Sequence, residues 1–81
     1  MPSQPAYHAL AEALETRLSI ISDRAWVARD APSHLDALRA ISEKLETLAA
    51  ELPRPLPGEM AHYLERRSYD KLLAWIRQGQ P

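Results

Sequence analysis

The sequence contains no cysteine and no phenylalanine, and only two of its 81 residues are glycine. Without cysteine, a small chain can form neither a disulfide framework nor a cysteine-based metal site. Two glycines are too few for a glycine-rich loop that cradles phosphate. Valine occurs only once, so the β-branched runs typical of strands are nearly absent. Stability must therefore come from helix packing and self-association, because a core of this size supplies only a few kcal/mol.

Charge and hydropathy also exclude several classes of protein. The formal net charge is −1, which gives no global attraction to nucleic acid or to an anionic membrane. The N-terminus lacks the basic start and apolar run of a signal peptide, and no stretch approaches the roughly 18 apolar residues of a membrane span. We therefore predict a single cytoplasmic domain over residues 1–81, without a membrane segment. The excess of Arg over Lys, together with abundant Ala, is typical of GC-rich bacterial genomes.

Composition and periodicity predict an all-α fold, and its clearest helix spans residues 33–52. The chain is 46% apolar and is dominated by Ala and Leu, which are strong helix formers. Apolar residues recur there at spacings of three and four, which places them on one stripe of a helix: Leu35, Leu38, Ile41, Leu45, Leu48 and Leu52. Ser33, followed by Asp36, resembles a capping box, and Asp30 is a competing cap.

A second long helix is predicted over residues 5–29, starting at Pro5. Its stripe has the same spacing: Tyr7, Leu10, Leu14, Leu18, Ile21, Ala25 and Ala28. Trp26 and Val27 lie partly off this stripe, so the end of the helix is apolar on more than one side. Pro32 disfavours a helical Ala31 and interrupts the chain before the next helix. The short connection predicts an antiparallel helical hairpin.

The remaining residues form a connector and a tail. Three prolines at alternate positions make residues 53–57 a stiff, extended connector. Residues 58–78 again have helical spacing, with Ser68 as a fresh cap. We predict two short helices, about 58–67 and 69–78, and a single helix bent near Ser68 is the alternative.

No group of residues carries a recognisable catalytic or metal-binding spacing. The three histidines, His8, His34 and His62, are far apart in the sequence and lack helical partners of the same type. The glutamate pairs of each long helix fall on its polar side and lack the histidine of a dimetal motif. We therefore predict a protein that is not an enzyme and that binds no metal or cofactor.

The apolar surface of two such helices exceeds what the tail covers, so we predict a homo-oligomer, with a dimeric four-helix bundle favoured. The function expected is that of a non-catalytic interaction protein, self-associating through its hairpin and open to a further protein partner. The predicted interface consists of nine apolar and aromatic residues: Leu18, Ile21, Trp26, Leu38, Ile41, Leu45, Tyr69, Leu72 and Trp75.

The alternative function is a small nucleic-acid-binding regulator that uses the basic tail. Arg66, Arg67 and Lys71 flank the turn between the two short helices, an arrangement loosely similar to a helix-turn-helix unit. The second helix, however, offers few polar residues to read bases, and the chain is slightly acidic overall. An interaction with nucleic acid is therefore the less favoured hypothesis.

Overall fold

The structure is a computed structural model that describes residues 5–78, and within that range it contains helices and no strand. The all-α prediction is confirmed. The helices are α1 (Pro5–Ser22), α2 (Arg24–Arg29), α3 (Ala31–Ala50), α4 (Gly58–Arg66) and α5 (Tyr69–Arg77).

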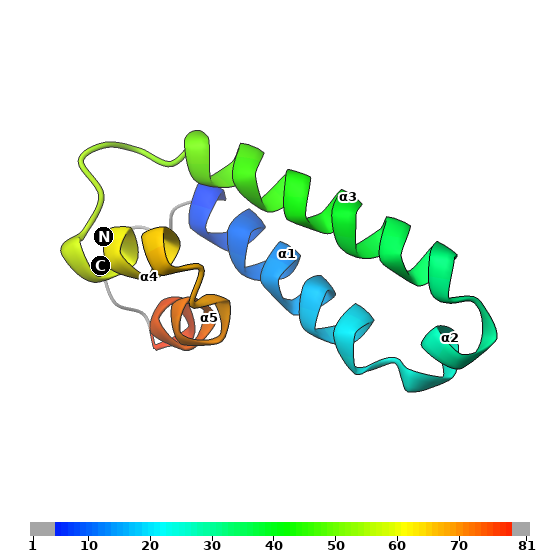
Figure 1. The fold of residues 1–81 in the computed structure, drawn as a ribbon. Coiled ribbons are helices and arrows are strands. Elements are labelled where there is room, and N and C mark those ends of the chain that lie inside the picture. Colours follow the sequence, from blue (N-terminus) through cyan, green and yellow to red (C-terminus); the bar gives the residue numbers. More distant parts are fainter. Residues whose placement is uncertain (1–4, 79–81) are drawn as a thin grey trace.

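The two long helices, α1 and α3, lie side by side and run in opposite directions, and α2 connects them at one end (Figure 1). We call them the α1–α3 pair. The tail, α4 and α5, lies at the other end, where α5 packs against both α1 and α4 (Figure 1). The end near α2 is called distal below, and the end near the tail is called proximal. The molecule measures 44 × 22 × 21 Å along its principal axes.

The predicted single helix over residues 5–29 is interrupted at Asp23, which separates α1 from α2. The Ser22 hydroxyl donates to the Leu18 carbonyl at 2.9 Å, and the Asp23 carboxylate accepts from the Trp26 backbone N–H at 3.0 Å. Asp therefore acts as an N-cap, because its short side chain competes with helix continuation. The break lets α2 turn across the distal end of the pair.

The next helix begins two residues earlier than the predicted Ser33, and Asp30 provides the cap. The Asp30 carboxylate accepts from the Ser33 backbone N–H at 3.1 Å. Pro32 lies in the first turn of α3, where its missing N–H has no helical partner to lose. The competing cap thus prevails over the Ser33–Asp36 box, and the chain between α2 and α3 is reduced to Asp30 alone.

The tail forms two separate helices, as the spacing predicted. Arg67 ends α4 in the left-handed conformation, with φ of 55°. The backbone N–H of Ser68 donates to the Tyr63 carbonyl at 2.9 Å, and that of Arg67 donates to the Leu64 carbonyl at 3.1 Å. This is the pattern of a Schellman motif, which stops a helix and reverses the chain. The alternative, a single bent helix, is therefore wrong, and the tail consists of two helices that pack on each other.

The hydrophobic core lies at the proximal end and joins all elements except α2. Its buried apolar residues come from α1, α3, the segment that follows α3, and the tail: Leu10, Ala13, Leu14, Ile41, Leu45, Leu52, Met60, Leu72 and Trp75. Full burial of a leucine-sized side chain contributes about 1.5–3 kcal/mol, so this cluster holds the tail to the pair.

Candidate interaction surface

Four large apolar side chains are exposed in the described part of the chain, and all lie between residues 18 and 35. Their exposed fractions are 37% for Leu18, 40% for Ile21, 39% for Val27 and 48% for Leu35. Single exposed apolar residues are common on protein surfaces. A group confined to one end of a molecule is less common and marks a candidate contact surface.

Two of these residues lie on the side of α1 that faces the tail. Glu15 forms an ion pair with Arg77 of α5, and Leu18 follows three residues later. The guanidinium of Arg17 lies 4.7 Å from the centre of the Tyr69 ring in α5, and Ile21 follows four residues later. Residues three and four apart share one helix face. Leu18 and Ile21 therefore continue, towards the distal end, the side of α1 that the tail covers.

Leu35 lies on the corresponding side of α3. Glu46 of α3 approaches Arg67 of the tail, with 3.7 Å between the guanidinium nitrogen and the carboxylate oxygen. Leu35 precedes Glu46 by 11 residues in the sequence, which is close to three full turns of a helix with about 3.6 residues per turn. Leu18, Ile21 and Leu35 thus share one side of the α1–α3 pair, and we call this surface the distal face.

The structure beneath the distal end is braced by polar contacts. The His34 Nε2 atom lies 2.7 Å from the Ile20 carbonyl oxygen, and the Trp26 indole N–H donates to the Ser33 hydroxyl at 3.3 Å. The rings of Trp26 and His34 meet edge to face, with centroids 5.5 Å apart. These contacts hold α2 against the start of α3, so the helices that form the distal end are fixed relative to one another.

The tail is held over the proximal half by both apolar and polar contacts. The Trp75 indole N–H donates to the Glu59 carboxylate at 3.0 Å, which joins α5 to α4. The turn between α4 and α5 covers the groove between α1 and α3 and leaves a shallow pocket there. Leu10, Leu45, Glu46, Ala49, Leu64, Arg67 and Tyr69 line it. The tail therefore forms a second layer that packs on α1 at one half of the pair, and its turn reaches Glu46 of α3.

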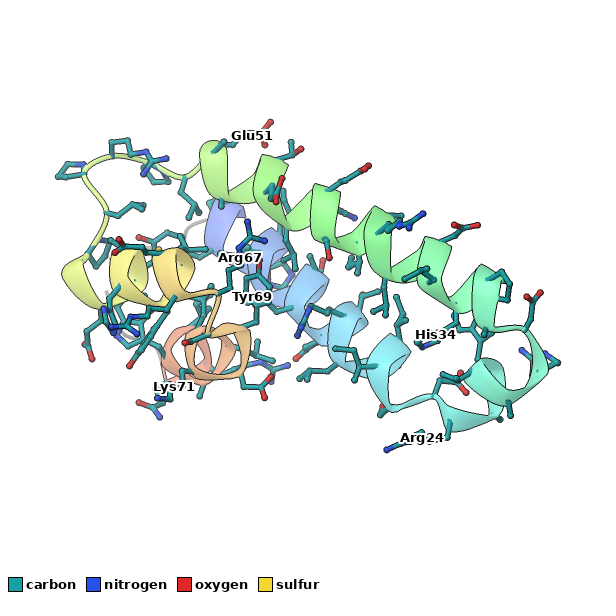
Figure 2. All side chains as sticks on the ribbon, in the orientation of Figure 1. Arg24, His34, Glu51, Arg67, Tyr69 and Lys71 are labelled. Atoms are coloured by element: carbon teal, nitrogen blue, oxygen red, sulfur yellow. The ribbon has the colours of Figure 1, made fainter. Side chains whose placement is uncertain are left out.

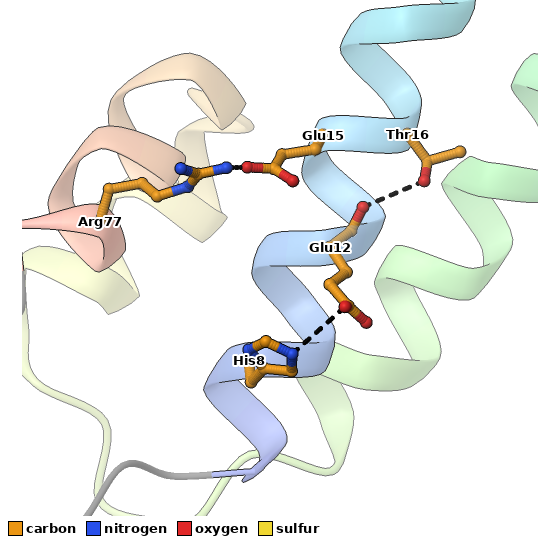
Figure 3. A network of polar contacts seen from close by, with 5 residues as sticks. All are labelled: His8, Glu12, Glu15, Thr16 and Arg77. Atoms are coloured by element: carbon orange, nitrogen blue, oxygen red, sulfur yellow. Dashed lines mark hydrogen bonds and ion pairs between the residues drawn. The ribbon is translucent and has the colours of Figure 1, made fainter.

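Polar side chains of α1, beside α5, form a small set of contacts (Figure 3). Arg77 of α5 pairs with Glu15, and His8 lies 3.2 Å from the Glu12 carboxylate one turn away. The Thr16 hydroxyl donates to the Glu12 carbonyl at 3.0 Å. All of these contacts are on partly or fully exposed side chains, where an ion pair contributes at most about 1 kcal/mol. Only the Arg77–Glu15 pair joins α5 to α1, and the other two contacts lie within α1.

The structure divides the nine predicted interface residues into three groups. Four are buried within the chain itself: Ile41, Leu45, Leu72 and Trp75. Three are partly buried: Trp26, Leu38 and Tyr69. Leu18 and Ile21 are exposed. The tail already covers the first group, so the surface that remains open to a partner is smaller than the sequence suggested and lies at the distal end.

The three basic residues of the nucleic-acid hypothesis are exposed, and two of them point in different directions. Figure 2 shows Arg67 turned toward the α1–α3 pair and Lys71 turned away from it. Arg67 lies near the Glu46 carboxylate, so part of its charge is offset locally. Arg66 is in the last turn of α4. Nucleic-acid binding through these residues stays a prediction.

Sequence reasoning overlooked Leu35 as a surface residue, although the signal was present. Counting back from Ile41 by seven residues gives His34 rather than Leu35, and seven residues are two turns of a helix. His34 is indeed buried, at 8% exposed, and takes the core position that Leu35 was expected to fill. Val27 was placed partly off the main stripe, and it is exposed at the distal end on α2.

Within residues 5–78, no group of three or more His, Cys, Asp or Glu side chains is placed to hold a metal ion. None of the helices described there combines the length and the apolar character that crossing a membrane requires.

Comparisons of this chain with models of protein families, with curated proteins and with solved structures found no match.

Proposed function

We propose that this chain is a non-catalytic helical interaction protein that self-associates through the distal face of its hairpin, the α1–α3 pair. The observation that supports the proposal is the continuity of one side of the pair. Its proximal half is covered by the tail, and its distal half exposes Leu18, Ile21 and Leu35. A further protein partner that docks on the same face is compatible with this proposal.

The expected strength of association follows from the exposed side chains. Covering the open part of each of these three residues contributes roughly 1 kcal/mol, since full burial of such a side chain contributes about 1.5–3 kcal/mol. Six side chains, three from each copy, give roughly 5 kcal/mol. Association itself costs about 4–15 kcal/mol in lost freedom. We therefore expect a weak, concentration-dependent assembly.

Sedimentation velocity across a concentration series tests the proposal. The wild-type mass average should rise from that of one chain at about 1 µM towards that of two chains at several hundred micromolar, the range in which weak complexes form. Leu35→Glu should abolish the rise, because a buried unpaired carboxylate is costly at an interface. Leu35 is half exposed, so this variant should retain its helical circular dichroism.

Ala40→Glu is the matched control. Ala40 is an exposed residue of the same helix and lies five positions from Leu35. Five residues correspond to about 140° around the helix axis, so Ala40 is on a different face. The control adds the same charge and should associate like the wild type. A wild-type mass that stays at one chain over the whole series would refute the proposal, as would equal behaviour of Leu35→Glu and Ala40→Glu.

A further inference from the structure

The shape of the molecule limits how two copies can meet. The tail packs against α1 and forms a second layer at the proximal half of the α1–α3 pair, and α2 marks the opposite end (Figure 1). The distal face lies on the same side of the pair as this layer, because Leu18 and Ile21 follow residues that contact α5. The surface of the described chain therefore has a stepped profile on this side. The tail forms the higher half, and the distal face forms the lower half.

We infer that two copies pack antiparallel, with each distal face against the other and with each tail beside the partner's α2. This arrangement rests on the proposed self-association and specifies its geometry. Packed helices lie about 8–10 Å apart, so the tail stands about one helix diameter above the pair. A second α1–α3 pair docked on the distal face would stand at the same height. The tail of one copy and the distal end of the other then lie end to end in one layer.

A parallel pairing cannot bring the two distal faces together. It would place tail against tail, and the two raised layers would hold the lower halves apart by about two helix layers, roughly 20 Å. Leu18, Ile21 and Leu35 would then remain in water. In the antiparallel arrangement a two-fold axis passes between the two distal faces, so each distal face meets its own copy.

The contact area agrees with a weak dimer. Half of the 44 Å length multiplied by the 22 Å width of the whole molecule sets an upper limit of about 500 Å² for the distal face, compared with about 800 Å² per partner in a stable complex. The approach of the tail to the partner's α2 adds to this area. The four predicted interface residues that the tail buries are not needed for the contact, since each stays within its own chain.

Two positions report the arrangement. Val27 is exposed on α2, at the distal end. Ala74 is exposed on α5. It lies two residues after the fully buried Leu72, and two residues correspond to about 200° around a helix, so Ala74 points away from the core. In the antiparallel dimer these two positions come from different copies and are neighbours, whereas the two Val27 residues lie at opposite ends of the contact.

Disulfide trapping tests this geometry, and the chain has no cysteine of its own to interfere. Val27→Cys and Ala74→Cys are made as separate proteins, mixed at a concentration where the wild type associates, and oxidised mildly. The mixed disulfide, identified by intact mass, should exceed either homodimer several-fold. Its yield should fall to the background when Leu35→Glu is added to both proteins. Ala40→Cys mixed with Val27→Cys is the control and should give only that background.

The outcomes separate the arrangement from the association itself. Homodimers of Val27→Cys and of Ala74→Cys in excess over the mixed product would establish parallel pairing, and would overturn the inference while self-association stands. Association by sedimentation without the mixed disulfide would also overturn it. A single-chain mass at every concentration would refute both the arrangement and the proposed function.

Discussion

Leu14 and Leu18 provide a direct test of the half-covered face, because they are the same residue type, one turn apart on one side of α1. Leu14 is 1% exposed and Leu18 is 37% exposed. Replacing a buried leucine by alanine removes its transfer free energy and leaves a cavity, at a cost of about 2–5 kcal/mol. At Leu18 no closed cavity forms, and only the buried part of the side chain is lost.

The difference can be estimated from the exposed fractions. The transfer term for a fully buried leucine is about 1.5–3 kcal/mol, so Leu18→Ala should lower the free energy of unfolding by about 1–1.5 kcal/mol in the monomer. Leu14→Ala should lower it by at least twice as much. A domain of this size has a total stability of only about 5 kcal/mol, so the Leu14 variant should retain only about 2–3 kcal/mol and should unfold at a clearly lower urea concentration.

Urea unfolding followed by helical circular dichroism measures both values. It should be performed at low micromolar concentration, where the monomer dominates, and repeated near the upper end of the sedimentation series. In the dimer the Leu18 side chain becomes covered, so the cost of Leu18→Ala should increase with protein concentration. The cost of Leu14→Ala should change less with concentration, because Leu14 is already buried in the monomer. Equal costs for the two variants in dilute solution would refute the placement of the tail over Leu14 alone.

Three further predictions concern the end of α4, the N-cap of α3 and the contacts of His34. Arg67 has a positive φ at the end of α4, so Arg67→Gly should leave thermal stability unchanged or raise it, whereas Arg66→Gly inside the helix should cost about 1 kcal/mol; equal losses would contradict the Schellman end. Asp30→Ala should cost about 1 kcal/mol by removing the cap of α3, while Asp36→Ala should cost little in the same melt, and the reverse order would favour the box at Ser33. His34→Ala should cost about 1–3 kcal/mol, because it leaves a carbonyl oxygen without its partner, and should change tryptophan fluorescence; an unchanged spectrum would argue against the Trp26–His34 contact.

Periodic spacing predicted the helices well because burial in a helix repeats every 3.6 residues. It identified Leu10 and Leu14 in one helix and Ile41 and Leu45 in the other, and all four are buried. It also gave two short helices in the tail, whose division at Ser68 depends on a local turn. These features are encoded within a few residues of where they occur.

The features that were missed depend on contacts distant in the sequence. Ile21, Ala25 and Ala28 continue the stripe of α1, so the pattern passes through Asp23 without a break. Asp23 ends the helix in a setting where Trp26 packs on His34, which belongs to the next helix. Spacing alone could not supply that contact.

The side on which the tail docks was likewise beyond the sequence pattern. It is set by pairs such as Arg17 with Tyr69 and Arg67 with Glu46, and by the direction in which the connector leaves α3. For this reason the predicted interface mixed residues that the tail covers with residues that it leaves open.

The incomplete cover of the α1–α3 pair follows from the lengths of the helices. At 1.5 Å per residue, α1 and α3 are about 27 and 30 Å long, whereas α4 and α5 are each about 14 Å long. The tail helices lie at one end of the pair, so they reach only its proximal half. The distal half, which the tail does not cover, could carry polar residues without loss of core packing. The continuation of the covered side instead carries Leu18, Ile21 and Leu35, and burial of these residues requires a second molecule.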